Sequence, residues 1–196
     1  KNDIISRAYY KLEEIDKKHN LFKNDKNILD VGCSPGGWTQ YILKKNPINK
    51  IVGIDILPTA EQIEGKIKFY MMDLNQYQLI DELFTLNKYT FDSIISDIAP
   101  NTSGNQFLDQ TNSYILSMLS AKFIEKYLNK GGNFLVKNFQ GEDTEKLFKF
   151  IKMNLHIFFI SSDVHTGIFL VIFILIITAA FLYMVISCLL YTSPSP

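Results

Sequence analysis

The chain has 196 residues, which is enough for one α/β domain with a buried core but not for two well-formed domains. Its 20 basic and 20 acidic side chains cancel, so any surface for a polyanion must come from local clustering of charge. Two cysteines and three scattered histidines exclude a disulfide framework and a zinc site of ordinary ligand spacing. The composition therefore indicates one neutral domain, suited to a reducing compartment.

The first 26 residues predict an amphipathic helix. Ala8, Tyr9, Leu12 and Ile15 recur at helical spacing between charged residues. Basic side chains outnumber acidic ones in this segment, which suits contact with phosphates and is equally typical of a solvated face. We therefore expect residues 1–26 to form a helical segment that packs on the core of the domain.

From residue 27 onward, short apolar runs alternate with helical periods. We predict strands and helices, in chain order, at 28–31 (strand), 37–45 (helix), 50–55 and 67–74 (strands), 79–86 (helix), 91–99 (strand), 113–129 (helix), 133–139 (strand) and 143–153 (helix). Such alternation is typical of a mostly parallel sheet with helices on both faces, the doubly wound α/β class. We therefore expect residues 27–153 to form one Rossmann-like domain.

A glycine-rich turn, ILDVGCSPGGWTQ, connects the first strand of this domain to its first helix. Glycines let the backbone approach a ligand, and the first turn of a helix offers free N–H groups, so the turn suits a nucleotide-like cofactor. The glycine spacing differs from the G-x-G-x-x-G fingerprint, and no G-K-[ST] follows. The turn therefore argues against NAD and ATP.

Aspartates stand at the ends of three successive predicted strands. Asp30 ends the first, Asp55 ends the second, where a carboxylate can bind ribose hydroxyls, and Asp73 ends the third, where it can bind an adenine amino group. Each aspartate alone is also a common cap or turn residue. As a series at one edge of the sheet, they favour an adenosine site.

Four segments, SRAYYKLEEID, LDVGCSPGGWTQYI, SDIAPNTSG and FLVKNFQGE, closely resemble motifs of the FtsJ/RrmJ family of S-adenosylmethionine-dependent RNA 2′-O-ribose methyltransferases. The likeness runs from residue 4 to about residue 153 and is strongest to the bacterial and organellar type that acts on a uridine of large-subunit ribosomal RNA. The resemblance implies the Rossmann-like methyltransferase fold, S-adenosyl-L-methionine as cofactor, and ribosomal RNA or the large ribosomal subunit as partner. We also expect a monomer without a metal ion, in the cytoplasm or a mitochondrion.

The resemblance also implies which residues bind the cofactor. The glycine turn supplies part of the site, and the strand ends supply the rest. The expected residues are Gly32 in the turn, Gly36 and Trp38 at the methionine part, Asp55 at the ribose, Asp73 at the adenine end, and Asp97 near the transferable methyl group.

The catalytic set of the family is Lys-Asp-Lys-Glu, and its first three members match Lys11, Asp97 and Lys137. A ribose 2′-hydroxyl must be aligned with the methyl group and relieved of its proton as the new bond forms. A partly desolvated lysine beside a second cation loses affinity for its proton, so it can act as a general base or hold the developing alkoxide. We expect Lys137 in this role, with Lys11 steadying the same hydroxyl and Asp97 orienting the methyl donor. The alternative for Lys137 is an edge lysine that reaches solvent.

The end of the chain departs from the family pattern. The glutamate expected on the last strand has no counterpart, and no carboxylate follows Asp163. The uncharged run from Ile168 to Tyr191 is long enough to cross about 30 Å of hydrocarbon as a helix. We interpret residues 154–196 as an atypical tail, produced by a change of reading frame or serving as a membrane anchor. A pair of buried strands is disfavoured because the run has no turn signal, so the last strands of the sheet are expected to be missing.

The missing glutamate leaves a second function open. A catalytically impaired protein of this fold would bind the cofactor and RNA as a ribosome-assembly factor. It would be attached to a membrane if the apolar run is an anchor. Methyl incorporation into ribosomal RNA distinguishes this factor from the enzyme.

Overall fold

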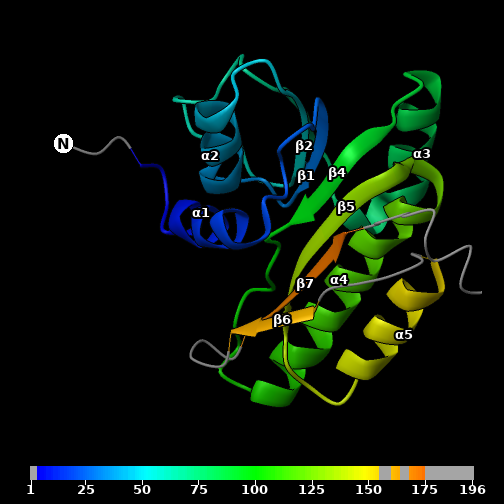
Figure 1. The fold of residues 1–196 in the computed structure, drawn as a ribbon. Coiled ribbons are helices and arrows are strands. Elements are labelled where there is room, and N and C mark those ends of the chain that lie inside the picture. The colour runs from blue at the N-terminus through cyan, green and yellow to red at the C-terminus, as the bar shows by residue number, and fades with distance from the viewer. Residues whose placement is uncertain (1–3, 155–159, 164–167, 175–196) are drawn as a thin grey trace, which may run out of the picture.

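The computed structural model of the chain describes residues 4–154, 160–163 and 168–174, and Figure 1 shows its fold. One sheet runs through it, with strand order β3-β2-β1-β4-β5-β7-β6. The strands are β1 (Asn27–Val31), β2 (Lys50–Asp55), β3 (Lys68–Met71), β4 (Phe91–Ser96), β5 (Leu128–Phe139), β6 (Ile160–Asp163) and β7 (Ile168–Ile174). The helices are α1 (Ala8–His19), α2 (Gly37–Lys45), α3 (Tyr77–Leu86), α4 (Gln106–Tyr127) and α5 (Thr144–Asn154), with a short 3₁₀ helix η1 (Leu74–Gln76).

Strands β1 to β5 run parallel to one another, whereas β7 is antiparallel to both β5 and β6. The chain leaves β1 toward β2 and β3, and later returns to place β4 on the other side of β1. The order of strands therefore reverses between β1 and β4, which is where open α/β sheets bind ligands. The predicted doubly wound, mostly parallel fold class is confirmed.

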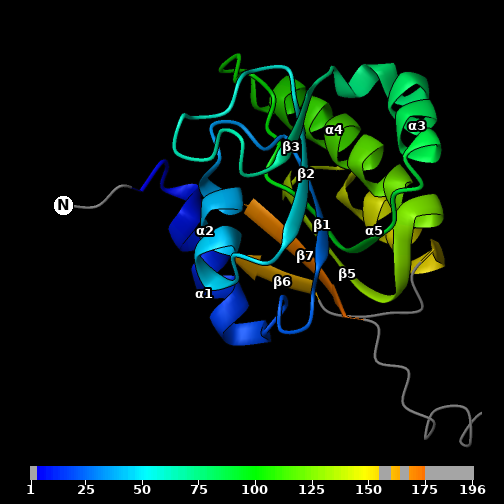
Figure 2. The same cartoon turned by 90° about the horizontal axis from the view of Figure 1, so that it is seen from above.

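Helices cover both faces of the sheet, with α1 and α2 on one side and α3, α4 and α5 on the other (Figures 1 and 2). Successive strand residues point to opposite faces, so neighbours enter different cores. Leu135 packs with Tyr9 and Leu12 of α1. Phe134, one residue earlier, packs with Phe123 and other side chains of the α3–α5 layer. The sheet is therefore buried on both faces, as its near-continuous apolar strands require.

Several predicted elements have different bounds in the structure; the strand expected at 91–99 ends at Ser96, and the strand expected at 133–139 begins at Leu128. The helix expected at 113–129 begins at Gln106, because the side chain of Asn105 caps it by accepting a hydrogen bond from the backbone N–H of Leu108 at 3.2 Å. The strand expected at 67–74 ends at Met71, because Asp73 caps η1 instead of continuing the strand. The side-chain caps of Asn105 and Asp73 therefore set the start of α4 and of η1.

The expectation that the last strands are missing is wrong. Strand β7 pairs with β5 from Asn133 opposite Ile174 to Phe139 opposite Ile168, and β6 pairs with β7. An apolar run suits an interior strand as well as a long helix, and the pairing covers the edge of β5. The interpretation of the apolar run as strands, which the sequence disfavoured, is therefore correct for its first part, Ile168–Ile174.

The rest of the apolar run, residues 175–196, lies outside the described residues. Among the helices that the structure describes, none is long and apolar enough to cross a membrane. The membrane-anchor and reading-frame interpretations of that remaining part stay predictions.

Candidate functional site

A cavity of about 420 Å³ opens at the carboxyl ends of β1, β2 and β4. Four of the six residues expected to bind the cofactor line it together, namely Gly32, Asp55, Asp73 and Asp97. Its volume falls in the range of ligand pockets, and its place is the switch point of the sheet. The structure thus brings the strand-end aspartates and the glycine turn to one cavity.

Gly32 is required by close packing as well as by its backbone conformation. Its φ is +75°, which side chains of L residues rarely adopt, and its N–H donates to the carbonyl of Ile54 at 2.8 Å. A Cβ atom at this position would lie 2.6 Å from the Cβ of Ile98. The glycine therefore lets the segment after β4 lie against the turn and form one wall of the cavity.

Gly36 and Trp38 are not among the residues that line the cavity. Gly36 has φ +119° at the start of α2, and a Cβ there would lie 2.2 Å from Cδ1 of Ile63. Trp38 is 3% exposed and packs in the same core as Tyr9 and Leu12. Both residues have a clear packing role, and their contact with the methionine part of a cofactor stays a prediction.

The carboxylate of Asp55 is held by two backbone N–H groups. Ser34 donates to one oxygen at 2.8 Å, and Leu57 donates to the other at 2.9 Å. A carboxylate offers about four acceptor positions, so each oxygen of Asp55 retains one. The side chain is thereby fixed in the wall of the cavity with capacity for a pair of hydroxyl groups.

Asp73 is both a cap and a cavity residue. Its Oδ1 accepts hydrogen bonds from the backbone N–H of Asn75 at 2.9 Å and from the Asn75 side chain at 3.0 Å. The capping alternative weighed for the strand-end aspartates is therefore realised here. No hydrogen bond between the second oxygen of Asp73 and another described residue is found, so that oxygen remains an acceptor at the cavity.

Asp97 and Lys137 form the charged centre of the site. The Nζ of Lys137 lies 2.5 Å from Oδ1 of Asp97 and donates to the Asp97 carbonyl at 2.7 Å. The two side chains are only 12% and 20% exposed. Lys137 therefore folds onto Asp97 instead of reaching solvent, and the pair stands at the edge of the cavity that Asp97 lines.

Lys11 lies on α1, half-buried, and makes no ion pair or hydrogen bond with another residue of the described ranges. The start of α1 abuts the glycine turn, since a Cβ on Gly37 would lie 3.2 Å from the backbone N of Tyr9. Leu135, two residues before Lys137, packs against α1, and alternate strand residues share a face. Lys11 and Lys137 therefore belong to the same face of the sheet, but no contact between them is found in the described part.

Asp30, the first aspartate of the series predicted to form an adenosine site, is buried and is not among the residues that line the cavity. The hydroxyl of Thr39 donates to it at 2.6 Å. Burial, together with the negative charges of Asp97 and Asp55, raises the pKa of Asp30 to about 7, although the hydrogen bond from Thr39 favours the charged form. In the sequence, only its place at the end of an apolar run indicated that Asp30 is close to the ligand edge of the sheet.

Among the described residues, no group of three or more histidine, cysteine or acidic side chains is placed to hold a metal ion. The arrangement is instead a glycine turn, two anchored aspartates and a lysine–aspartate pair around one cavity. This combination of fold and site defines a Rossmann-like methyltransferase.

The FtsJ-like methyltransferase family matches residues 4–162, and the chain belongs to this family. The chain is 42% identical over 156 residues to the ribosomal RNA large subunit methyltransferase E of Buchnera aphidicola subsp. Acyrthosiphon pisum, an alignment that covers 78% of this chain and 74% of that protein. It is 40% identical over 146 residues to the protein of the same name from Legionella pneumophila strain Lens, covering 74% and 70%.

Among solved structures, a candidate ribosomal RNA methyltransferase from Plasmodium falciparum is similar over 87% of this chain and 98% of its own. The TM-score is 0.75 and the sequence identity is 30%. Sequence and structure thus agree that the chain is an enzyme of the methyltransferase class.

Proposed function

We propose that the chain transfers a methyl group from S-adenosyl-L-methionine to a ribose 2′-hydroxyl of RNA, and that this RNA is large-subunit ribosomal RNA. One observation carries the proposal: Lys137 is joined to Asp97, which lines the same cavity as Gly32, Asp55 and Asp73. The names of the relatives support ribosomal RNA as the substrate, either free or in the large subunit.

The cavity suits this cofactor, whose sulfonium carries an electrophilic methyl group. The free acceptor positions of Asp55 fit the two hydroxyls of a ribose, and the free oxygen of Asp73 fits an adenine amino group. Asp97 offers a negative charge for the sulfonium end. We propose that these three aspartates hold the ribose, the base and the methyl end, respectively.

Lys137 is suited to hold the acceptor hydroxyl. An ammonium group has three N–H donors; Lys137 donates one to the carbonyl of Asp97, and its charge is paired with the Asp97 carboxylate. A remaining N–H can bind the 2′-oxygen and align it with the methyl group. Its charge then stabilises the developing alkoxide, and after loss of a proton the amine can serve as general base.

The family pattern of four catalytic residues is incomplete at the last strand. Strand β7 is the neighbour of β5, and Leu170 is in register with Lys137. The sequence of β7, IFLVIFI, contains no carboxylate. We therefore propose that Lys11, Asp97 and Lys137 carry the reaction.

The family match favours an enzyme over the assembly factor, and we propose that this enzyme acts in the cytoplasm or a mitochondrion.

The test is incorporation of a radioactive methyl group from S-adenosylmethionine into unmodified large-subunit ribosomal RNA and into large subunits. After nuclease digestion, we expect the label in a 2′-O-methyl nucleoside. DNA of the same sequence is the control, because it lacks the acceptor hydroxyl. Absence of label, or label on a base, would overturn the proposal.

A further inference from the structure

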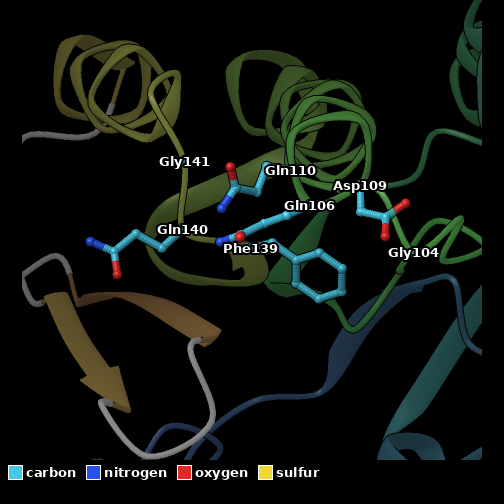
Figure 3. A pocket seen from close by; sticks show the side chains of 7 residues that line it. All are labelled: Gly104, Gln106, Asp109, Gln110, Phe139, Gln140 and Gly141. Atoms are coloured by element: carbon cyan, nitrogen blue, oxygen red, sulfur yellow. The ribbon is translucent and has the colours of Figure 1, made fainter.

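A second pocket, of about 720 Å³, lies between the start of α4 and the loop that follows β5 (Figure 3). Its walls are amide side chains, one aromatic ring and two glycines. We call it the glutamine pocket, and its lining residues are Gly104, Gln106, Asp109, Gln110, Phe139, Gln140 and Gly141. None of the residues that line the cofactor cavity belongs to it.

We propose that the glutamine pocket binds a nucleobase of the RNA substrate, next to the ribose that receives the methyl group. This inference rests on the proposed function, because it names the part of the substrate that a second site would hold. It makes the pocket a determinant of which nucleotide is presented to Lys137.

The position of the pocket supports this role. Phe139 follows Lys137 by two residues on β5, so both side chains leave the strand on the same side and about 7 Å apart along it. This separation is short enough for one nucleotide to contact both. A ribose at Lys137 therefore places a base of the same or the adjacent nucleotide at the glutamine pocket.

The chemistry of the lining fits a nucleobase. Figure 3 shows the side chains of Gln106 and Gln110 on the side of the pocket that faces Phe139, whereas the side chain of Gln140 points away from the ring. None of these three amides forms a hydrogen bond with another residue in the described part of the chain. Each amide offers donors and an acceptor, as base edges do, and an aromatic ring can stack on a base.

The charge of the lining argues against a phosphate as the ligand. The lining residues include no lysine or arginine, and their one ionisable side chain is the acid Asp109. Its Oδ1 accepts hydrogen bonds from the backbone N–H and the hydroxyl of Ser103, both at 2.8 Å. These bonds hold the loop before α4 in place, and a backbone phosphate would meet a negative charge with no lysine or arginine among the described residues that line the pocket.

Close packing fixes one wall of the pocket. A Cβ on Gly141 would lie 3.0 Å from the Cβ of Gln110 and 3.1 Å from its Oε1. The backbone after β5 therefore lies directly against Gln110 and limits where its amide can go. Such a restriction lowers the entropy lost when Gln110 binds a base edge.

The test compares four variants of the full chain with the wild-type protein, using unmodified large-subunit ribosomal RNA transcribed in vitro. Methyl transfer gives kcat and KM for RNA, and filter binding gives the Kd. We expect Gln106→Ala/Gln110→Ala and Phe139→Leu each to raise KM and Kd for RNA about tenfold or more, with kcat changed by less than about threefold. Phe139→Tyr keeps the ring and should bind RNA like the wild-type protein.

The matched control is Gln78→Ala, an exposed glutamine of α3 outside both pockets. It should leave all these constants unchanged. Thermal unfolding of each variant shows whether a loss reflects misfolding. If the pocket variants keep the wild-type KM and Kd while the wild-type protein is active, the pocket inference fails and the proposed function stands. If the wild-type protein transfers no methyl group, the proposed function fails, and the Kd values still test the pocket.

Salt dependence separates a base from a phosphate as the ligand. Loss of a phosphate contact reduces the slope of log Kd against log salt by about one, whereas loss of a base contact leaves the slope unchanged. We expect parallel lines for the wild-type protein and for Gln106→Ala/Gln110→Ala. A reduced slope would show a backbone contact and overturn the nucleobase assignment.

Discussion

The ammonium group of Lys137 lies 2.5 Å from Oδ1 of Asp97 and 2.7 Å from the carbonyl oxygen of the same residue. Asp97 directly follows β4, and Lys137 lies near the end of β5, its parallel neighbour. The pairing of the two strands therefore fixes the distance between the two groups. Since Asp97 also lines the cofactor cavity, the pair connects the place of the methyl donor to the place of the acceptor.

Replacement of Lys137 should separate catalysis from cofactor binding. We expect Lys137→Ala to lower kcat by about 10²–10⁴-fold, because the 2′-oxygen then loses the group proposed to align it and to accept its proton. Cofactor affinity, measured by calorimetry, should stay within a few-fold. Lys137→Arg keeps the charge but cannot lose a proton, so activity in this variant would indicate that charge alone suffices.

The matched control for that experiment is Lys130→Ala. Lys130 is an exposed lysine on the same strand, so it tests the loss of one positive charge from β5 without touching the site. We expect full activity. If Lys137→Ala were as active as Lys130→Ala, Lys137 would have no role in the chemistry.

Lys11 should matter for turnover although it makes no contact with Lys137 in the described structure. We expect Lys11→Ala to lower kcat by about 10–100-fold, since a second cation helps to hold a developing alkoxide. Lys18→Ala, an exposed lysine near the end of the same helix, should have no effect. Equal kcat values for the two variants would show that Lys11 is an ordinary surface residue.

The parallel core of the sheet could be predicted because its signals are local. Short apolar runs between helical periods located β1, β2, β4 and β5, and the ends of parallel strands necessarily meet at one edge. Asp55 and Asp73, two of the three aspartates predicted to lie together, line one cavity, whereas Asp30, the third, does not line it. The start of α4 was missed because the sequence before residue 113 has no clear apolar period, and the capping amide of Asn105 was its only signal.

Other features depend on tertiary packing and could not be predicted. An apolar indole beside a glycine turn suits a ligand contact and a buried core equally, and the structure buries Trp38 with Tyr9 and Leu12. The apolar sequence of β7 is consistent with a strand or a helix until a partner is known, and the exposed edge of β5 supplies that partner. The glutamine pocket forms between segments that are far apart in the chain, so no local spacing of residues predicts it.

Asp55→Asn should weaken cofactor binding. The amide replaces one acceptor oxygen with a donor, so it loses either a backbone bond to Ser34 or Leu57 or a bond to a ribose hydroxyl. A hydrogen bond to a charged group contributes about 1.5–3 kcal/mol, which predicts a rise in Kd of about 10–100-fold. Calorimetric titration with S-adenosylmethionine or its demethylated product measures it. Asp143→Asn, at a surface ion pair with Lys146, should bind like the wild-type protein.

Gly32→Ala should destabilise the fold more than the same change at Gly65. Both glycines have positive φ, +75° and +71°, so both variants incur backbone strain of about 1–2 kcal/mol. Only at Gly32 would the new Cβ lie 2.6 Å from Ile98, whereas nothing lies within 4 Å of the corresponding atom at Gly65. Urea unfolding should show the larger loss for Gly32→Ala, together with weaker cofactor binding. Equal losses would mean that Ile98 moves away freely.

Asp30 should make the protein less stable as the pH rises toward 7. Burial raises its pKa to about 7, whereas an aspartate in an unfolded chain titrates near 3.9. Between about pH 4 and pH 7 the folded state therefore binds more protons than the unfolded state, so the free energy of unfolding falls as the pH rises. Above about pH 7 both states are ionised, and the full cost of the buried charge is present.

The pH dependence of the free energy of unfolding distinguishes the contribution of Asp30 from that of Asp25. Asp25, whose pKa burial raises to about 6, contributes to the same fall in stability. We expect Asp30→Asn to flatten the curve most between about pH 5 and 7, and Asp25→Asn to flatten it at lower pH. Asparagine also leaves a buried N–H₂ group beside Thr39. This lowers the free energy of unfolding by about 1–3 kcal/mol, and because the penalty is the same at every pH it shifts the whole curve without adding a slope of its own. A variant curve parallel to that of the wild-type protein would show that Asp30 is already ionised at low pH in the folded state.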